Sequence, residues 1–117
     1  MGKSTIHPKE VKELLWTNPN PGVAYSTTTL TIDLSPYTFI EVWYQENAYG
    51  GVYKKALLKI GIDTYIFSIA GGATARQFIT TTSSITIYSA IYYNAYGGNS
   101  ATTNNNVIIP YQIYGIK

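Results

Sequence analysis

Apolar and polar side chains alternate with a period of two through most of this chain, and this pattern limits what it can fold into. The clearest stretch covers residues 29–34, where the apolar positions are Leu30, Ile32 and Leu34. A period of two places successive side chains on opposite faces of a strand, so the stretch predicts a half-buried antiparallel strand. The same period continues to the C-terminus without a sustained helical stripe, which predicts an all-β protein.

Clusters of Gly, Pro and Asn divide the chain into further strands. The predicted strands besides 29–34 are 12–16, 38–45, 52–60, 64–70, 76–81, 84–93 and 107–116. Residues 12–16 also fit one helical turn with Val11, but a strand is the preferred interpretation. Pro110 lacks a backbone donor, so we expect it at a sheet edge or a bulge.

The number and spacing of these segments predict one domain. Seven to eight short strands with short connections indicate an antiparallel two-sheet sandwich or jelly roll. The 117 residues suffice for a single hydrophobic core without disulfides or metal. We therefore expect a loose N-terminal segment at 1–11 and a single β-sandwich domain at 12–117.

The strand predicted at 38–45 is apolar on both faces, although a sandwich core uses only one. The two sets are Ile40, Val42 and Tyr44 on one face and Phe39 and Trp43 on the other. We expect the first set to fill the core. Phe39 and Trp43 would then form a subunit interface, because an exposed apolar patch is costly in water. If the opposite face is the core, the roles of the two sets exchange.

The sequence Asn-Ala-Tyr-Gly-Gly occurs at residues 47–51 and again at 94–98. Turn chemistry alone is one interpretation, because Asn and Gly tolerate left-handed backbone conformations. The other is that two similar turns present aromatic rings at one end of the sandwich, beside an exposed polar loop at 99–106. The ligand-binding residues of this second hypothesis are Tyr49, Tyr92, Asn94, Tyr96 and Asn99.

The charge and hydropathy of the chain limit the classes of partner that we expect. Eight Lys and Arg against six Asp and Glu give a net charge of +2 without a basic stripe, so nucleic acid is not expected. No apolar run approaches the roughly 20 residues of a membrane helix, so membrane insertion is not expected either. The N-terminus lacks the apolar core of a signal peptide, which indicates synthesis in a cytoplasm.

Residues capable of catalysis or metal binding are few. There is no cysteine, and the one histidine, His7, lies in the loose N-terminal segment, which argues against a catalytic triad or a His/Cys metal site. A glycosidase pair or an oxygen-ligated calcium site would need facing carboxylates, and surface solubility explains those present more simply. The carboxylates considered are Asp33, Glu41, Glu46 and Asp63. We expect no enzyme activity and no cofactor.

Four segments carry a resemblance to a known group of proteins. They are Leu-Leu-Trp-Thr-Asn-Pro-Asn-Pro at 14–21, Leu-Thr-Ile-Asp-Leu-Ser at 30–35, residues 37–42, and Ile-Pro-Tyr-Gln-Ile-Tyr-Gly-Ile-Lys at 109–117. In this order they resemble small tail-associated β domains of bacteriophages and prophages of Gram-positive, often gut-dwelling, bacteria. The resemblance covers most of the chain from Lys12 onward, and it rests on short strand and turn motifs.

The resemblance implies a virion protein made in the host cytoplasm. Such domains end a tail fibre, baseplate part or head fibre, commonly as a homotrimer joined to other virion proteins, and their tip loops engage host-surface polysaccharide. The twelve tyrosines suit this role because Tyr offers a large, stiff contact. The alternative is a monomeric carbohydrate-binding or adhesion module of a bacterial surface protein, located at the cell surface. A stable trimer would favour the virion.

Overall fold

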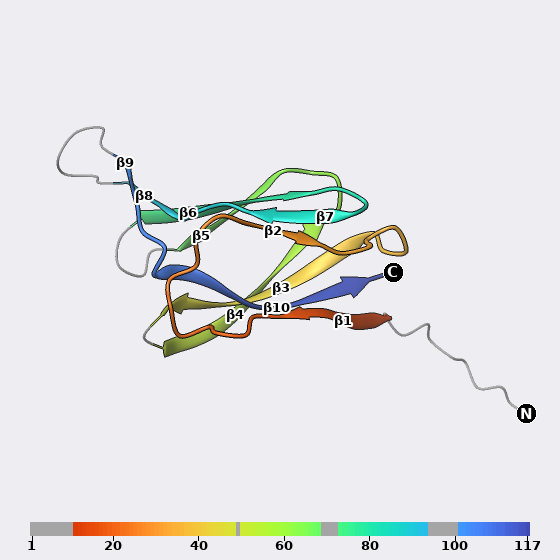
Figure 1. The fold of residues 1–117 in the computed structure, drawn as a ribbon, viewed down its shortest axis with the longest axis horizontal. Coiled ribbons are helices and arrows are strands. Elements are labelled where there is room, and N and C mark those ends of the chain that lie inside the picture. The colour runs from red at the N-terminus through yellow and green to blue at the C-terminus, as the bar shows by residue number, and fades with distance from the viewer. Residues whose placement is uncertain (1–10, 49, 69–72, 94–100) are drawn as a thin grey trace, which may run out of the picture.

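The computed structural model describes residues 11–48, 50–68, 73–93 and 101–117. Within these ranges ten strands form two antiparallel sheets that pack face to face (Figure 1). The strands are β1 (Lys12–Thr17), β2 (Thr28–Thr31), β3 (Phe39–Asn47), β4 (Gly50–Lys59), β5 (Thr64–Ser68), β6 (Ala73–Thr80), β7 (Ser84–Ile87), β8 (Ile91–Tyr93), β9 (Ala101–Thr103) and β10 (Val107–Ile116). The predicted all-β sandwich is confirmed, with ten strands in place of seven or eight.

Sheet A has the strand order β1-β10-β3-β4 and forms the lower layer of Figure 1. Sheet B, the upper layer, has the order β2-β7-β6-β8-β9, and β5 pairs with the other edge of β6. Lys12 lies opposite Ile116, so the first and last strands are neighbours. This pairing confirms the strand interpretation of residues 12–16 over the helical turn.

The core lies between the two sheets. Its buried members are Leu34, Ile40, Val42, Tyr44, Leu58, Ile66, Phe78, Ile85, Ile87, Val107, Ile108 and Ile113. The apolar set of β3 that was expected to fill the core does so. Phe39 and Trp43 consequently lie on the outer face of sheet A, where both are half-buried.

Several segments differ from the sequence-based prediction, among them the strand predicted at 29–34, which ends at Thr31. The strand predicted at 84–93 is divided into β7 and β8, because the backbone between them bonds elsewhere: the Tyr88 carbonyl accepts from Arg76, and Ser89 bonds to Thr27. Residues 101–103 of the segment predicted as a polar loop form β9, which pairs with β8. No apolar alternation marks that short strand.

Strand β10 departs from regular geometry at two places. Its register with β3 shifts between Pro110 and Gln112, so Pro110 lies at a bulge, as predicted. Further upstream, Ile108 has a φ of 55°, in the left-handed region that β-branched residues rarely adopt.

A buried cation joins the two sheets at this point. Arg76 of β6 is 0% exposed, and its guanidinium donates to four carbonyl oxygens: Ile108 at 2.8 Å, Val107 at 3.1 Å, Tyr25 at 2.9 Å and Tyr88 at 2.7 Å. None of the ion pairs among the described residues includes it. Burial lowers the pKa of Arg76 to about 10, so the side chain stays charged at neutral pH.

Candidate functional site

A pocket of about 270 Å³ lies on the outer face of sheet B. We call it the tyrosine trough, and its lining residues are Thr27, Tyr65, Ala75, Gln77, Tyr88, Ser89, Ile91 and Tyr93. They come from β5, β6, β8 and the segments before β2 and after β7. The trough therefore depends on the pairing of strands that are separate in the sequence.

The sizes of the side chains along β6 explain the shape of the trough. Alternation sends Arg76 and Phe78 into the core, which leaves Ala75 and Gln77 on the outer face. Ala75 lies between Phe67 of β5 and Ile91 of β8 in the Cα register. Small or slender residues thus form the floor, and larger ones on both neighbouring strands form the walls.

The walls are aromatic and unusually open to solvent. Tyr65 is 50% exposed, Tyr93 49% and Tyr88 37%, while the flanking Phe67 is 71% exposed. The rings of Tyr65 and Phe67 also contact each other, with centroids 6.2 Å apart. Contiguous exposed aromatic surface of this kind is typical of an interaction site.

The polar groups at the trough differ in how many hydrogen bonds they already make within the protein. The Thr27 and Ser89 hydroxyl oxygens lie 3.1 Å apart, and Asn105 Nδ2 donates to Ser89 Oγ at 3.3 Å. Asn105 Oδ1 in turn accepts from the amide of Ala90 at 2.9 Å, which fixes this margin. The Gln77 side chain has no hydrogen bond to any described residue, so its amide remains available to a ligand.

Most of the ligand-binding residues predicted from the repeated turns cannot be compared with the trough. Tyr49, Asn94, Tyr96 and Asn99 lie outside the described residues. Tyr92 lies opposite Thr74, which is buried, and therefore projects from the inner face of β8. Its neighbour Tyr93 lines the trough instead.

Sequence reasoning missed the trough residues, although one signal was present. If Ile66 of β5 lies in the core, alternation places Tyr65 and Phe67 together on the outer face. Gln77 gave no signal of its own, because its role depends on which strands flank β6.

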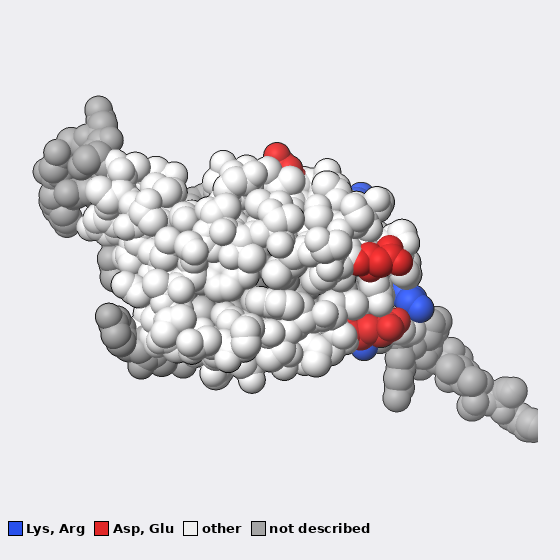
Figure 2. Space-filling view, in the orientation of Figure 1, with Lys and Arg blue, Asp and Glu red and all other residues white. Residues whose placement is uncertain are grey.

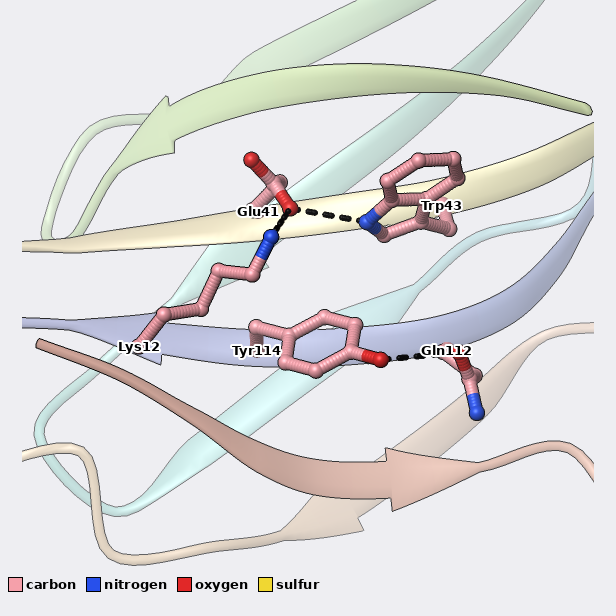
Figure 3. Close-up of polar contacts among 5 residues, drawn as sticks. All are labelled: Lys12, Glu41, Trp43, Gln112 and Tyr114. Carbon is pink, nitrogen blue, oxygen red and sulfur yellow. Dashed lines mark hydrogen bonds and ion pairs between the residues drawn. The ribbon is translucent and has the colours of Figure 1, made fainter.

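The outer face of sheet A carries a second cluster (Figure 3). Glu41 Oε1 accepts from Lys12 Nζ at 2.9 Å and from Trp43 Nε1 at 2.7 Å, and Tyr114 Oη donates to Gln112 Oε1 at 3.1 Å. Burial by itself would raise the pKa of Glu41. The hydrogen bonds from Lys12 and Trp43, with nearby lysine charge, outweigh burial and hold that pKa below its ordinary value.

Cations also cover the ring of Trp43. Lys12 Nζ lies 5.9 Å from its centroid and Lys55 Nζ lies 5.4 Å from it, on a side chain that is already half-buried. The surface expected to be a bare apolar patch is thus a mixed one, in which a buried carboxylate bonds to Lys12 and to the indole of Trp43, and Lys12 and Lys55 lie over the indole ring.

Three of the four candidate carboxylates, Asp33, Glu41 and Glu46, have structural partners. Asp33 accepts from the Ser35 amide and hydroxyl, Glu41 pairs with Lys12, and Glu46 pairs with Lys54 at 2.8 Å. Within the described ranges no group of three or more His, Cys, Asp or Glu side chains is placed to hold a metal ion. A low-pKa glutamate paired with lysine is unsuited to act as a general acid at neutral pH.

Charge is distributed unevenly on the face of the molecule that Figure 2 shows. Figure 2 shows charged side chains gathered mainly near the end that holds the start of β1 and the C-terminus, while most of this view is uncharged. No helix long and apolar enough to cross a membrane occurs in the described part of the chain. Comparisons with protein-family models, curated proteins and solved structures find no significant match to this chain.

Proposed function

We propose that the chain is a glycan-binding adhesion module that serves as a structural and receptor-binding domain of a phage virion. The observation that carries the binding function is the tyrosine trough, with three half-exposed tyrosines around an unpartnered amide. The C–H faces of sugars stack on aromatic rings, and sugar hydroxyls pair with amide groups. This combination suits a carbohydrate better than a purely apolar ligand.

The lining of the trough supports binding without catalysis. Its described lining residues include no carboxylate, histidine or lysine, so among them no acid and base pair faces a bound ligand. Weak binding at one such site becomes effective when several copies act together. A homotrimer at the end of a fibre would supply those copies, with Phe39 and Trp43 in the subunit interface and other virion proteins as further partners.

The virion assignment is supported by the resemblance of the strand and turn motifs to tail-associated domains. The alternative is a monomeric carbohydrate-binding module at a bacterial cell surface, which would use the same trough. Light scattering distinguishes them, because a stable trimer favours the virion and a monomer favours the surface module.

The binding function is tested with whole Gram-positive cells and purified cell-wall glycan. The double variant Tyr65→Ala with Tyr93→Ala should lower binding by about tenfold or more, because each ring supplies stacking area. Its melting temperature should stay close to that of the wild type, since both rings are half-exposed. The matched control is Ile62→Ala, which removes an exposed apolar side chain from the segment between β4 and β5 and should bind normally.

Two results would contradict the proposal. The first is a wild-type protein that binds neither cells nor any glycan. The second is a double variant that binds as well as the wild type, which would remove the trough from the binding surface.

A further inference from the structure

The geometry points to an uncharged glycan as the ligand of the tyrosine trough, with one pyranose ring stacked on a tyrosine of the wall and Gln77 as the residue that reads its hydroxyl groups. This inference rests on the glycan-binding function proposed above and specifies the class of sugar. It also assigns a specificity-determining role to one side chain.

The absence of charge in the lining excludes the common acidic sugars. Of the lining residues that the structure describes, none is an acid or a base at neutral pH. The one cation on β6, Arg76, points into the core and donates to four backbone carbonyls there. A carboxylate or phosphate placed in the trough would lose water without gaining a charged partner, which is unfavourable. Uronate, sialate and phosphate-bearing polymers therefore fit poorly.

The spacing of the strands sets the size of the ligand. The walls rise from β5 and β8, which pair with opposite edges of β6, so the backbones of these two strands lie about 10 Å apart, or two strand spacings. Tyr65 lies opposite Gln77 and Tyr93 lies opposite Ala73, so the two tyrosines are offset along β6. Van der Waals contact takes up roughly 4 Å on each side of an inserted ring. This width therefore admits one sugar ring above the floor, and the offset of the tyrosines means that the ring stacks on one tyrosine at a time. The volume of about 270 Å³ is likewise near the lower end for small-molecule pockets.

Gln77 supplies the polar contact within this space. It lies opposite Tyr65 in the register of β5 and β6, so its amide is next to one aromatic wall. An amide both donates and accepts, which matches sugar hydroxyls, whereas an ionised carboxylate only accepts. At the margin, the hydroxyls of Thr27 and Ser89 are already held by their mutual bond, so little order is lost when a ligand uses them.

The test of charge uses the full chain titrated by NMR or calorimetry with two sets of oligosaccharides. The neutral probes are oligomers of glucose, galactose and N-acetylglucosamine, and the anionic probes are galacturonate oligomers, sialyllactose and polyglycerol phosphate. A neutral probe should bind with a Kd that changes less than about twofold between about 50 and 500 mM NaCl, because salt screens only charge interactions.

The outcomes separate this inference from the proposed function. If only anionic probes bind, or if the affinity falls more than about tenfold at high salt, the inference is wrong while glycan binding stands. If no probe, cell or cell-wall glycan binds, both are wrong.

The test of Gln77 uses Gln77→Ala and Gln77→Glu. Gln77→Ala should weaken binding of the neutral probe by about tenfold, the effect of one lost hydrogen bond, and should reduce the preference among hexoses. Gln77→Glu keeps the shape of the side chain but loses the two amide donors, so it should weaken binding as much as Gln77→Ala does. The control is Gln112→Ala, an amide on the outer face of sheet A. Unchanged affinity and preference in Gln77→Ala would overturn the assigned role.

Discussion

Arg76 Nε donates a 2.8 Å hydrogen bond to the carbonyl of Ile108. Among the residues that the structure describes, Ile108 is the non-glycine residue with a positive φ. Left-handed backbone at a β-branched residue costs about 1–2 kcal/mol. The turn it produces lets the successive carbonyls of Val107 and Ile108 both reach one guanidinium, which adjacent carbonyls of a regular strand do not. The strain in β10 of sheet A is thus offset by a cation from β6 of sheet B.

Replacing this cation should loosen the contact between the sheets. Arg76→Met keeps much of the side-chain volume but leaves four carbonyl oxygens without their donor, so urea unfolding should show a loss of about 3 kcal/mol. The exposed cation Lys59 provides the control, because Lys59→Met should change stability by less than about 0.5 kcal/mol. A loss below about 1 kcal/mol in Arg76→Met would contradict this interpretation.

The ion pair of Glu41 should make the free energy of unfolding depend on pH in the acid range. Its pKa is lowered in the folded state, so the stabilisation is complete above the ordinary value of 4.5 and disappears as the pH falls through the lower folded pKa. Glu41→Gln should therefore be less stable by about 1 kcal/mol at pH 7, with a smaller deficit at about pH 3. Urea unfolding at both pH values checks this. An equal deficit at both would show that the charge is not responsible.

The ring of Tyr37 packs directly on Gly115 of β10. A Cβ at Gly115 would lie 2.7 Å from Tyr37 Cδ1, so Gly115→Ala forces the ring or the strand to move and should cost about 1–3 kcal/mol in thermal unfolding. Gly22→Ala is the matched control, since its Cβ would meet its nearest neighbour, Asn20 Oδ1, at 4.0 Å. Equal melting temperatures for the two variants would argue against the packing constraint.

The proposed homotrimer depends on a subunit interface at the outer face of sheet A. If Phe39 and Trp43 lie in a subunit interface, Trp43→Ala should dissociate the oligomer more than it destabilises the fold, because burial of one such ring contributes about 1.5–3 kcal/mol. Light scattering across a concentration series, with urea unfolding of the same samples, measures both effects. A wild-type protein that remains monomeric at high concentration would refute the interface.

The repeated turns offer a test of whether the binding surface extends beyond the trough. Tyr49→Ala with Tyr96→Ala should abolish binding to whole cells if the two turns share a site, while the melting temperature stays nearly unchanged. Binding equal to the wild type would leave the repeat as turn chemistry alone. The loss of cell binding in this variant, compared with the loss in the double variant Tyr65→Ala with Tyr93→Ala, then shows which of the two surfaces contributes more to binding.

The alternation of side chains was enough to predict which residues share a face of a strand. Ile40, Val42 and Tyr44 were assigned to one face of a strand, and residues 107–116 to a strand bulged at Pro110, and both predictions are confirmed. These features are local, because a period of two fixes which side chains share a face whatever the neighbouring strands are. The break between β7 and β8 was not predicted, because it is caused by hydrogen bonds with distant residues: the Tyr88 carbonyl accepts from Arg76, and the Ser89 amide donates to Thr27 Oγ1.

Strand order was decided by the tertiary structure alone. Periodicity gives the face of each strand but not its neighbour, so only the pairing of β5 and β8 with β6 turns Tyr65, Gln77 and Tyr93 into one trough. The same holds for Arg76, because a charged residue in a strand is normally assigned to the surface. Its burial is possible only where carbonyls from distant segments, including the left-handed turn at Ile108, converge on one guanidinium.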